Sequence, residues 1–493
     1  MSQRRKAVEK ELADFLSGPA LQFVLTQLYN VTKKIGHRWT ENDKSLALSI
    51  FHASPKVYRI LRKIFLLPSV STLQRVLRNV QVYPGFNNNI LKALKQKVSS
   101  MPPNAELCCV VFDEMTIRET VTYNMERDFV EGLEDFGNSG RTKHVANHAT
   151  VFMVQGLLTN WKQAVGYFLS SGSMDSKLLH SLLLECLDKL EETGLEVKVM
   201  IADQSSNNGR SFEQLCKVTE EEPFFFHKGR KIYMMYNPPR LLKDVCNNMK
   251  KHGFVVKGEE INWTYIEQFY NFDKQNAVRI APELTAKHID MPPSSALHVK
   301  YAAQVLSHSV AAGLSFLVTL QVLSPDATAT ALFIEKFDQL FNAFNSRNLR
   351  SSQRKGHGMT GTSGHVEFLQ DTLDWLQSVQ LPETARSSQL SCLTRWKMAI
   401  RSLLALWEEL SNNYGVNILL TDRLNQDCVE DLFSTIRGKG GHGDNPSADQ
   451  FRTVLRQAMV DSFLVHSHCK EDTDGCLPDF NSLIWSEEED DPV

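Results

Sequence analysis

The chain lacks the features that mark membrane-spanning, secreted and disulfide-stabilised proteins. No apolar run among its 493 residues reaches the ~18 residues that a membrane span needs. The charged beginning, MSQRRKAVEKELADF, has no apolar core of the kind found in a secretory signal. The nine cysteines include no CxxC pair, which argues against a structural zinc site or a disulfide framework and favours a reducing compartment. We therefore expect no membrane partner.

Glycine-rich nucleotide loops of the two commonest kinds are also missing. Neither GxGxxG nor GxxxxGK[ST] occurs, which argues against a Rossmann nucleotide fold and against a P-loop. What is present is an ordinary composition, with 42% hydrophobic and 23% charged residues. Such a chain can bury several cores, and at roughly 150 residues per domain its length predicts about three domains.

Positive charge is concentrated at the beginning of the chain, although the net charge is only −3. Residues 1–100 contain 17 Lys and Arg against 5 Asp and Glu, which leaves −15 for the remainder. A basic region of this kind favours a partner that carries phosphate groups, such as double-stranded DNA. An ordinary solvated helical surface would have the same composition.

Residues 1–100 have the apolar spacing of several short helices. Apolar residues recur at intervals of three and four in VEKELADFLSGPALQFVLTQLYNV and ENDKSLALSIFHASPKVYRILRKIF, and SVSTLQRVLRNV follows as a capped helix. Short helices around Pro and Ser turns, rich in Arg and Lys, suit a helix-turn-helix-like module. A plain helical accessory domain explains the pattern equally well.

Residues 101–252 change to a pattern of buried strands. Three β-prone stretches come first, AELCCVVFDEM, KHVANHATVFMVQGLL and WKQAVGYFLSSG, followed by a helix over 173–193. A strand VKVMIAD, a helix NNGRSFEQLCKV, a strand PFFFHKGRKIYMMY and a helix that starts at Pro238 then alternate. Three consecutive strands followed by alternating elements predict an α/β fold with an RNase H-like mixed sheet.

The rest of the chain is mostly helical. We expect one long helix over 299–323, another over 329–348, an exposed Gly- and Ser-rich loop over 350–366, and a return to helix over 393–437. The expected regions are a basic helical module at 1–100, the first part of the RNase H-like domain at 101–252 and a mostly helical stretch at 253–390. The final part of the domain follows at 391–460, and an acidic tail at 461–493.

Carboxylates stand at the ends of two predicted buried strands. Asp113 closes VVFDEM and Asp203 closes VMIADQ, and both lie at one rim if the strands are parallel neighbours. A carboxylate there is costly to bury unless it is paired or binds a cation, and Mg²⁺ prefers oxygen ligands. Asp427 and Glu430, three residues apart on one helical face, could supply a third acid. A helix cap or turn would also explain either aspartate.

Several strings resemble the P-element-type DNA transposases of animals and their domesticated relatives. They are GHRWTENDKSLALSIFHASPKVYRILRK, FDEM, ADQSSNN, NPPRLLK, LHVKYAAQVLSHSV, NSR, and NQDCVEDLFSTIRGKGG followed by DNPSADQFR, in family order from about residue 37 to 458. FDEM, the PPxLLK string and the QDxxExxFSxIRxxGG string are specific in combination.

The resemblance implies a DDE triad of Asp113, Asp203 and Glu430 that holds Mg²⁺ or Mn²⁺. The implied reaction is phosphodiester cleavage and strand transfer at transposon ends, with two metal ions that activate the nucleophile and stabilise the leaving oxygen. It also implies a nuclear protein that binds double-stranded DNA and forms a homo-oligomer.

The resemblance further implies a GTP-binding insertion, with Asp427, Asn345, Asn342 and Lys257 as the candidate ligands. Asn342 stands where the family has an Asp that suits the donors of guanine, and an amide lacks the charge for a bidentate pair, so we expect weaker guanine binding. Lys257 could reach a phosphate, and it could equally be an exposed turn lysine.

The sequence departs from the family in two other ways, and the first of them motivates an alternative function. The family's zinc-coordinating Cys-and-His pattern is not found, and Asn237 and Arg240 stand where the family commonly has Asp and His. The alternative is a domesticated, catalytically silent protein that binds DNA or other proteins. A nuclease acting on RNA is a third and weaker reading, because nothing in the sequence points to recognition of a 2′-hydroxyl.

Smaller features receive ordinary structural interpretations. The histidines 357, 365 and 442 lie in Gly-rich stretches without a metal-ligand spacing, so we expect loop histidines. Arg437 and Lys439 could hold a DNA phosphate beside the glutamate helix, or Gly438 could cap that helix. We expect the tryptophans 263, 396 and 407 in the core.

Overall fold

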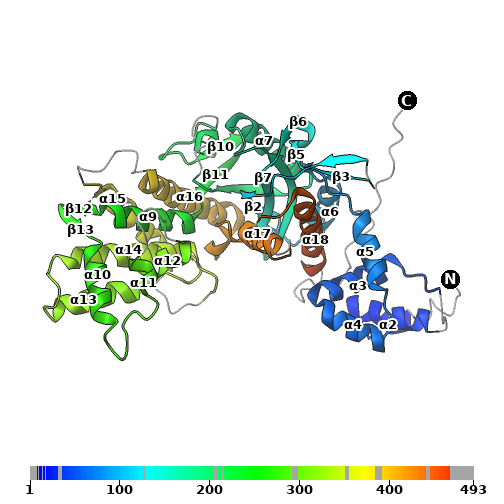
Figure 1. Ribbon diagram of the computed structural model, residues 1–493, viewed down its shortest axis with the longest axis horizontal. Coiled ribbons are helices and arrows are strands. Elements are labelled where there is room, and N and C mark those ends of the chain that lie inside the picture. The colour runs from blue at the N-terminus through cyan, green and yellow to red at the C-terminus, as the bar shows by residue number, and fades with distance from the viewer. Residues whose placement is uncertain are drawn as a thin grey trace.

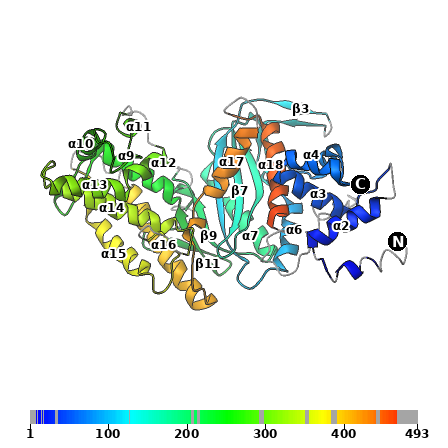
Figure 2. The ribbon, with the colours of Figure 1, turned by 90° about the horizontal axis from the view of Figure 1, so that it is seen from below.

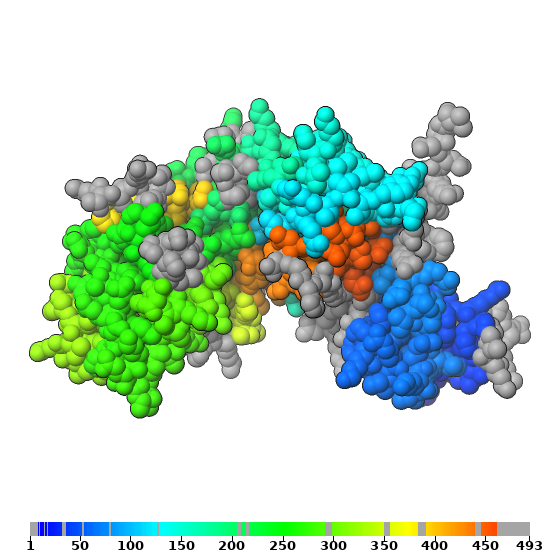
Figure 3. Space-filling view, in the orientation of Figure 1, coloured from blue at the N-terminus to red at the C-terminus, as the bar shows by residue number. Residues whose placement is uncertain are grey.

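The structure is a computed structural model of the 493-residue chain. It describes residues 8, 10–13, 15–16, 18–31, 36–125, 128–204, 209–212, 216–290, 298–349, 355–382, 391–439 and 445–466. A central sheet domain lies between a lobe of N-terminal helices and a lobe formed by the helical insertion (Figures 1 and 3).

The described part of the chain forms a nine-stranded mixed sheet at the centre of the molecule. The strand order is β10-β11-β9-β2-β7-β8-β5-β6, and β1 pairs with β8. Both β2 with β9 and β9 with β11 are parallel pairs, whereas β7 is antiparallel to β2 and to β8. The strands are β1 Gly85–Phe86, β2 Leu107–Thr116, β5 Leu133–Asp135, β6 Arg141–Val145, β7 His148–Gly156, β8 Lys162–Ser170, β9 Glu196–Ala202, β10 Phe224–His227 and β11 Arg230–Tyr236. This topology confirms the predicted RNase H-like mixed sheet.

Helices cover the two faces of this sheet, which explains why its central strands are apolar throughout. Helix α7 (Ser176–Glu192) lies on one side, and α17 (Asp427–Lys439) and α18 (Ala448–His466) lie on the other (Figure 1). All residues of β2 from Leu107 to Phe112 are buried, as expected for a strand covered on both faces. The long helix α16 (Ser391–Tyr414) packs against β11 at one edge.

The N-terminal module consists of helices whose ends are defined by polar caps. The helices are α2 Gly18–Asn30, α3 Glu41–Ala53, α4 Pro55–Ile64, α5 Val70–Asn79 and α6 Asn88–Val98. Thr40 and Asp43 form a reciprocal capping box at the start of α3, and Ser54 and Ser69 cap α4 and α5. Helices α3 and α5 pack against α18, so this module is attached to the sheet domain (Figure 2).

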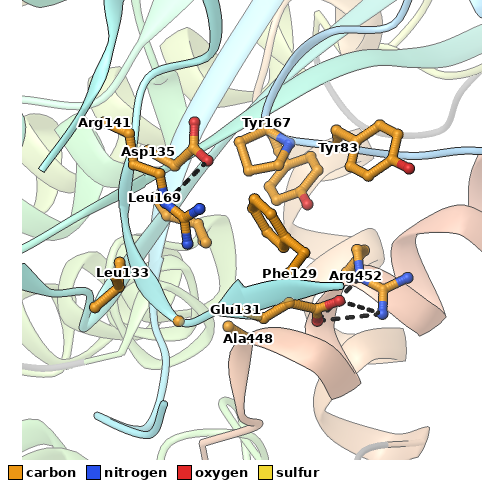
Figure 4. A pocket seen from close by; sticks show the side chains of 12 residues that line it. Tyr83, Phe129, Glu131, Leu133, Asp135, Arg141, Tyr167, Leu169, Ala448 and Arg452 are labelled. Carbon is orange, nitrogen blue, oxygen red and sulfur yellow. Dashed lines mark hydrogen bonds and ion pairs between the residues drawn. The ribbon is translucent and has the colours of Figure 1, made fainter. Parts of the chain in front are cut away.

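A small hairpin beside α18 is held by a buried ion pair. Strands β3 (Thr122–Asn124) and β4 (Phe129–Glu131) pair outside the main sheet. Glu131, at the end of β4, accepts hydrogen bonds from Nε and Nη2 of Arg452 on α18, and a second pair joins Arg141 to Asp135 (Figure 4). The first pair attaches the hairpin to α18, and the second joins β6 to β5 at the edge of the main sheet.

The insertion is helical with one small sheet. Helix α9 (Pro238–His252) leads into it. The insertion contains the helices α10 Thr264–Asp273, α11 Ala286–Ile289, α12 Val299–Val305, α13 His308–Thr319, α14 Ala327–Phe344 and α15 His365–Gln377, and the strands β12 Phe254–Val256, β13 Glu259–Ile261 and β14 Val379–Gln380. Helix α9 packs against α12, α14 and α16 and therefore connects the sheet to the insertion. Trp396 is fully buried between the rings of Phe337 and Phe344, and the tryptophans 263 and 407 are also buried, as predicted.

The predicted long helix over 299–323 is wrong. Leu306 leaves the helical conformation, with φ −86° and ψ 55°, so α12 and α13 are separate helices. The stretch Val299–Thr319 is long and apolar enough by composition to cross a membrane, but a helix of a protein core passes the same test. Here the two helices pack against α9, α10 and α14.

Two predicted strands are each divided in the structure. The stretch 143–158 contains the end of β6 and all of β7, because the main chain of Ala146 bonds to Gly132 and that of Asn147 bonds to Ser170. The stretch 223–236 is a hairpin, since Lys228 and Gly229 both have positive φ (47° and 80°), the geometry of a tight two-residue turn.

Other sequence expectations are partly met. The stretch 393–437 is not one helix, because α16 ends at Tyr414 and α17 starts at Asp427. Of the helix expected over 207–218, residues 209–212 are described and are helical. The acidic tail beyond residue 466 lies outside the described residues.

Candidate active site

Asp113 and Asp203 are brought together by adjacent parallel strands. In the register of β2 and β9, Val111 lies opposite Ile201, so the two aspartates, two residues further on, lie at the same level of the sheet. Asp113 is still within β2 and is 6% exposed, whereas Asp203 follows the last residue of β9. The expectation that the two strands are parallel neighbours is confirmed, but Asp113 does not close its strand, because β2 continues to Thr116.

Glu430 reaches the same rim from helix α17. The start of this helix is fixed by Gln426, whose Nε2 donates to the carbonyl oxygen of Phe112 at 2.7 Å and whose main-chain N–H donates to Asn237 Oδ1 at 3.2 Å. Gln426 and Asn237 are both buried. These bonds tie the first turn of α17 to the residue before Asp113 and to the start of α9.

A single guanidinium group contacts all three acids. Arg240, on the first turn of α9, donates from Nη2 to Asp113 Oδ2 at 2.6 Å and from Nη1 to Asp203 Oδ2 at 2.7 Å. Its Nε lies 3.7 Å from Glu430 Oε1. Three carboxylates from three separate elements thus converge on one positive charge.

Burial and charge act in opposite directions on these groups. Burial raises the pKa of Asp113 to about 7, although the Arg240 charge lowers it, and the charge of Asp203 raises it further. Burial likewise raises the pKa of Glu430, again against the effect of Arg240. Burial would lower the pKa of Arg240, but the charges of Asp113, Asp203 and Glu430 outweigh it and raise that pKa. The site therefore favours a bound cation.

An open depression of about 180 Å³ lies beside the acids. It is lined by Phe112, Asp113, Glu114, Thr116, His148, Thr150, Leu179, Asp203 and Arg240. One of these residues, Glu114, accepts hydrogen bonds from the Ser173 hydroxyl and the Met174 main-chain N–H. The depression gives a polar ligand access to the rim of the sheet.

The three carboxylates suit a divalent cation, but oxygens of Asp113 and Asp203 accept hydrogen bonds from Arg240. Within the described ranges no group of three His, Cys, Asp or Glu side chains is close enough to hold a metal ion. Carboxylate oxygens are nevertheless the ligands that Mg²⁺ and Mn²⁺ prefer, and the carboxylates of Asp113, Asp203 and Glu430 lie within reach of one guanidinium. The chemical type of these side chains therefore suits a site for a divalent metal ion.

Three of the candidate nucleotide ligands lie where α14 ends and α17 begins. Asn342 is on the last turn of α14 and donates to Asp338 Oδ2 at 3.0 Å, and Asn345 ends that helix. Asp427 begins α17 and pairs with Arg347 at 3.0 Å. Hydrogen bonds between Ser346 and Thr421 join the two regions.

Lys257 lies elsewhere in the insertion. It is exposed in the turn between β12 and β13, where it has a φ of 52° and precedes Gly258. This hairpin is at the outer end of the insertion, whereas α17 lies beside the central sheet (Figure 1). The structure therefore does not bring Lys257 together with Asp427.

The expectation for His365 is wrong. It is 1% exposed at the start of α15, where its ring contacts that of His357 and bonds to Ser363 and to the Lys355 carbonyl. His442 lies outside the described residues. Gly438 does not end its helix as expected, because α17 continues to Lys439, and Arg437 is exposed on that helix.

The contacts of Arg240 and Gln426 could not be derived from the sequence. In the sequence, Arg240 is marked only by its departure from a family string, and Gln426 only by its place in one. A faint signal was available for Arg240, because it opens the helix that directly follows a strand parallel to the Asp203 strand.

Family models match three segments of the chain. Residues 82–216 match the TNP-like RNase H N-terminal domain, residues 240–357 the TNP-like GTP-binding insertion domain, and residues 423–454 the TNP-like RNase H C-terminal domain. The three occur in the order in which the sheet, the insertion and helices α17 and α18 follow one another.

Individual proteins show the same likeness. The chain is 27% identical to the Transposable element P transposase of Drosophila melanogaster over 447 residues, 89% of this chain and 56% of that protein. It is 26% identical to the DNA transposase THAP9 of Homo sapiens over 349 residues, 65% of this chain and 37% of that protein. A solved structure, the Drosophila P element transposase strand transfer complex, matches the fold with a TM-score of 0.75 and 23% identity, over 95% of this chain and 99% of that one. The match thus spans about half or less of each curated relative.

Proposed function

The chain belongs to the P-element-type transposases, and from this premise we propose that it cleaves and joins DNA at Asp113, Asp203 and Glu430. Membership supports nuclease or transposase activity in general. The observation that supports these three residues is their convergence on Arg240 from β2, the end of β9 and α17.

In this proposal the three carboxylates hold divalent metal ions, Mg²⁺ or Mn²⁺. A bound metal would supply an activated water or 3′-hydroxyl and would stabilise the leaving oxygen of an in-line displacement at phosphorus. The chain's own part is positioning: β2 and β9 fix the two aspartates at one level of the sheet, and Gln426 fixes the first turn of α17 and thereby Glu430. The depression beside them admits the phosphodiester.

Double-stranded DNA is the proposed substrate. Contacts to its phosphates are expected to contribute most of the binding free energy. On helix α4 the four basic residues Lys56, Arg59, Arg62 and Lys63 are exposed, and the residues before position 101 carry most of the excess positive charge. Basic side chains in such an arrangement bind phosphates with strong salt dependence. We therefore propose that this helix-turn-helix-like module contacts DNA, that the protein acts in the nucleus and that it forms a homo-oligomer.

GTP is the proposed ligand of the insertion. The match of residues 240–357 to a GTP-binding insertion domain supports a nucleotide site, and Asn342, Asn345 and Asp427 lie around one junction. An amide oxygen and a carboxylate can accept hydrogen bonds from the N–H groups of guanine, although Asn342 lacks the charge of a second carboxylate. Lys257 is not included in this proposed site, because it lies in the distant hairpin.

A second function, a catalytically silent DNA-binding protein, is favoured by one observation. Arg240 engages oxygens of Asp113 and Asp203 that a metal would need. A protein in which the arginine never leaves would bind DNA without cutting it.

A nicking assay separates the two functions. Supercoiled DNA carrying transposon-end sequences is incubated with the full chain and Mg²⁺ or Mn²⁺, and nicked product is measured for wild type, Asp203→Ala and Glu430→Gln. The proposed function requires activity in the wild type and its loss in both variants, with DNA binding retained. Asp374→Asn, which alters an exposed aspartate on α15, serves as the matched control and should cut at the wild-type rate. Equal cutting by wild type and Asp203→Ala would rule out the site, and cutting by neither would favour the silent protein.

A further inference from the structure

The two terminal nitrogens of Arg240 donate hydrogen bonds to different acids. Nη2 donates to Asp113 and Nη1 to Asp203, at 2.6 and 2.7 Å, while Nε faces Glu430 at 3.7 Å. These are the short distances of charge-assisted hydrogen bonds. A planar guanidinium with five fixed donors suits this bridging geometry, and a lysine ammonium does not.

Both oxygens of Asp113 are engaged in this arrangement. Oδ2 accepts from Arg240, and Oδ1 accepts from the main-chain N–H of Glu114 at 2.9 Å. Because Asp113 is 6% exposed, it has little access to water that could replace either partner. A metal ion bound at Oδ2 would lie against the positive guanidinium, so the two cations compete for this carboxylate.

We propose that Arg240 is a tethered cation that competes with divalent metal for Asp113, Asp203 and Glu430, so that metal binds only when the arginine side chain leaves. This inference rests on the proposed function, since it assumes that these acids are the metal ligands. The three acids need a cation beside them, because leaving buried charges without a partner is strongly unfavourable. The guanidinium and a metal ion repel each other, so the acids bind one or the other at a given time.

The surroundings of Arg240 leave room for this exchange. The arginine side chain is 29% exposed, more than that of Asp113 or Asp203, and it lines the open depression beside the acids. It stands on the first turn of α9, so its side chain can rotate toward the depression without breaking the helix. If DNA binds beside these acids, one of its phosphates could accept the hydrogen bonds of the released guanidinium.

Binding of Mn²⁺ to the full chain tests the proposal without any need for activity. The free ion is measured by its electron paramagnetic resonance signal during titration of wild type and Arg240→Gln in the absence of DNA. We expect Arg240→Gln to bind Mn²⁺ at least about tenfold more tightly, because the competing charge is gone. Arg395→Gln is the matched control, since Arg395 donates to Gln204 next to Asp203 and should leave the affinity unchanged.

A second variant guards against loss of folding, which circular dichroism would reveal. Arg240→Lys keeps a cation near the acids but cannot reach both aspartates, so it should fold and bind Mn²⁺ with intermediate affinity. Wild-type affinity in both Arg240 variants would overturn the proposal. Tight binding that survives Asp113→Asn in the Arg240→Gln background would also overturn it, because the metal would then lie elsewhere.

The outcome is separable from that of the proposed function. If Arg240→Gln binds Mn²⁺ tightly through Asp113 and yet no variant cuts DNA, the competition stands and the proposed nuclease activity fails. If the wild type cuts DNA and Arg240→Gln binds Mn²⁺ no more tightly, the competition fails and the nuclease activity stands.

Discussion

The side-chain amide of Gln426 donates a hydrogen bond of 2.7 Å to the carbonyl oxygen of Phe112, the residue before Asp113. This bond joins the first turn of the helix that carries Glu430 to the strand that carries Asp113. Both partners are buried. The geometry of the candidate active site therefore depends on a residue that is not one of its acids.

Replacing Gln426 should damage stability and activity together. Gln426→Met keeps the size of the side chain but leaves the Phe112 carbonyl buried without its donor, which costs about 1–3 kcal/mol. Urea denaturation measures this loss. Glu430 should also be displaced, so cleavage should slow by at least about tenfold. Gln339→Met, which removes a half-buried amide from α14 and is remote from the sheet, should leave cleavage unchanged; equal rates in both variants would contradict the positioning role of Gln426.

A buried lysine should matter more for stability than any surface ion pair. Lys198 on β9 lies 2.6 Å from both Glu196 and Glu409, and the Glu409 contact attaches α16 to the sheet. Lys198→Met leaves both carboxylates without their cation and should cost about 3 kcal/mol in urea denaturation. Adding Glu409→Gln should recover part of this loss.

The matched control for that experiment is Lys162→Met. The Lys162 amine lies 3.5 Å from the exposed carboxylate of Asp431, and such a pair is worth at most about 1 kcal/mol. An equal loss of stability in Lys162→Met and Lys198→Met would contradict the prediction that the buried lysine contributes more than the exposed one.

Stability should decline in mild acid because of His365. Burial lowers the pKa of His365 to about 4 from an ordinary value of 6.5. Between these values the unfolded chain binds the proton and the folded chain does not, so stability is full above pH 6.5 and is lost as the pH falls toward 4. The loss should be roughly 1–3 kcal/mol. Urea denaturation at pH 7.5 and pH 5 should show a smaller difference for His365→Gln than for wild type.

An exposed histidine provides the comparison for that measurement. His144→Gln, on β6, should keep the pH dependence of the wild type, since the side chain is 66% exposed. A pH dependence that persists unchanged in His365→Gln would assign the acid sensitivity to other groups.

Restoring a carboxylate in the insertion should strengthen guanine binding. Asn342→Asp supplies the charge that a bidentate contact with guanine requires, and we expect about tenfold tighter binding of a fluorescent GTP analogue. The titration should be done at pH 8. Burial raises the pKa of the neighbouring Asp338 to about 6, and a new carboxyl beside it must stay ionised against that like charge. Binding of the corresponding ATP analogue should not improve; an equal gain for both nucleotides would place Asn342 away from the base.

Much of the sheet could be predicted because its strands carry a strong local signal. The runs that became β2, β7, β8 and β9 are β-prone and apolar enough to predict buried strands, and their order predicted the mixed sheet. The expected helix over 299–323 failed because apolar periodicity does not show where a chain must turn to pack, and Leu306 turns between α12 and α13. The division of 143–158 into β6 and β7 likewise depends on bonds to Gly132 and Ser170, which are distant contacts.

The sequence by itself determined which residue types stand at the ends of the buried strands and in what order the family strings occur. Those features are local, and they sufficed to nominate Asp113, Asp203 and Glu430. Only the tertiary structure decided that Arg240 lies among these acids and that Lys257 lies far from Asp427. Such facts depend on how strands pair and helices pack across 37 to 317 residues of chain, and no local pattern records which side chains meet at those separations.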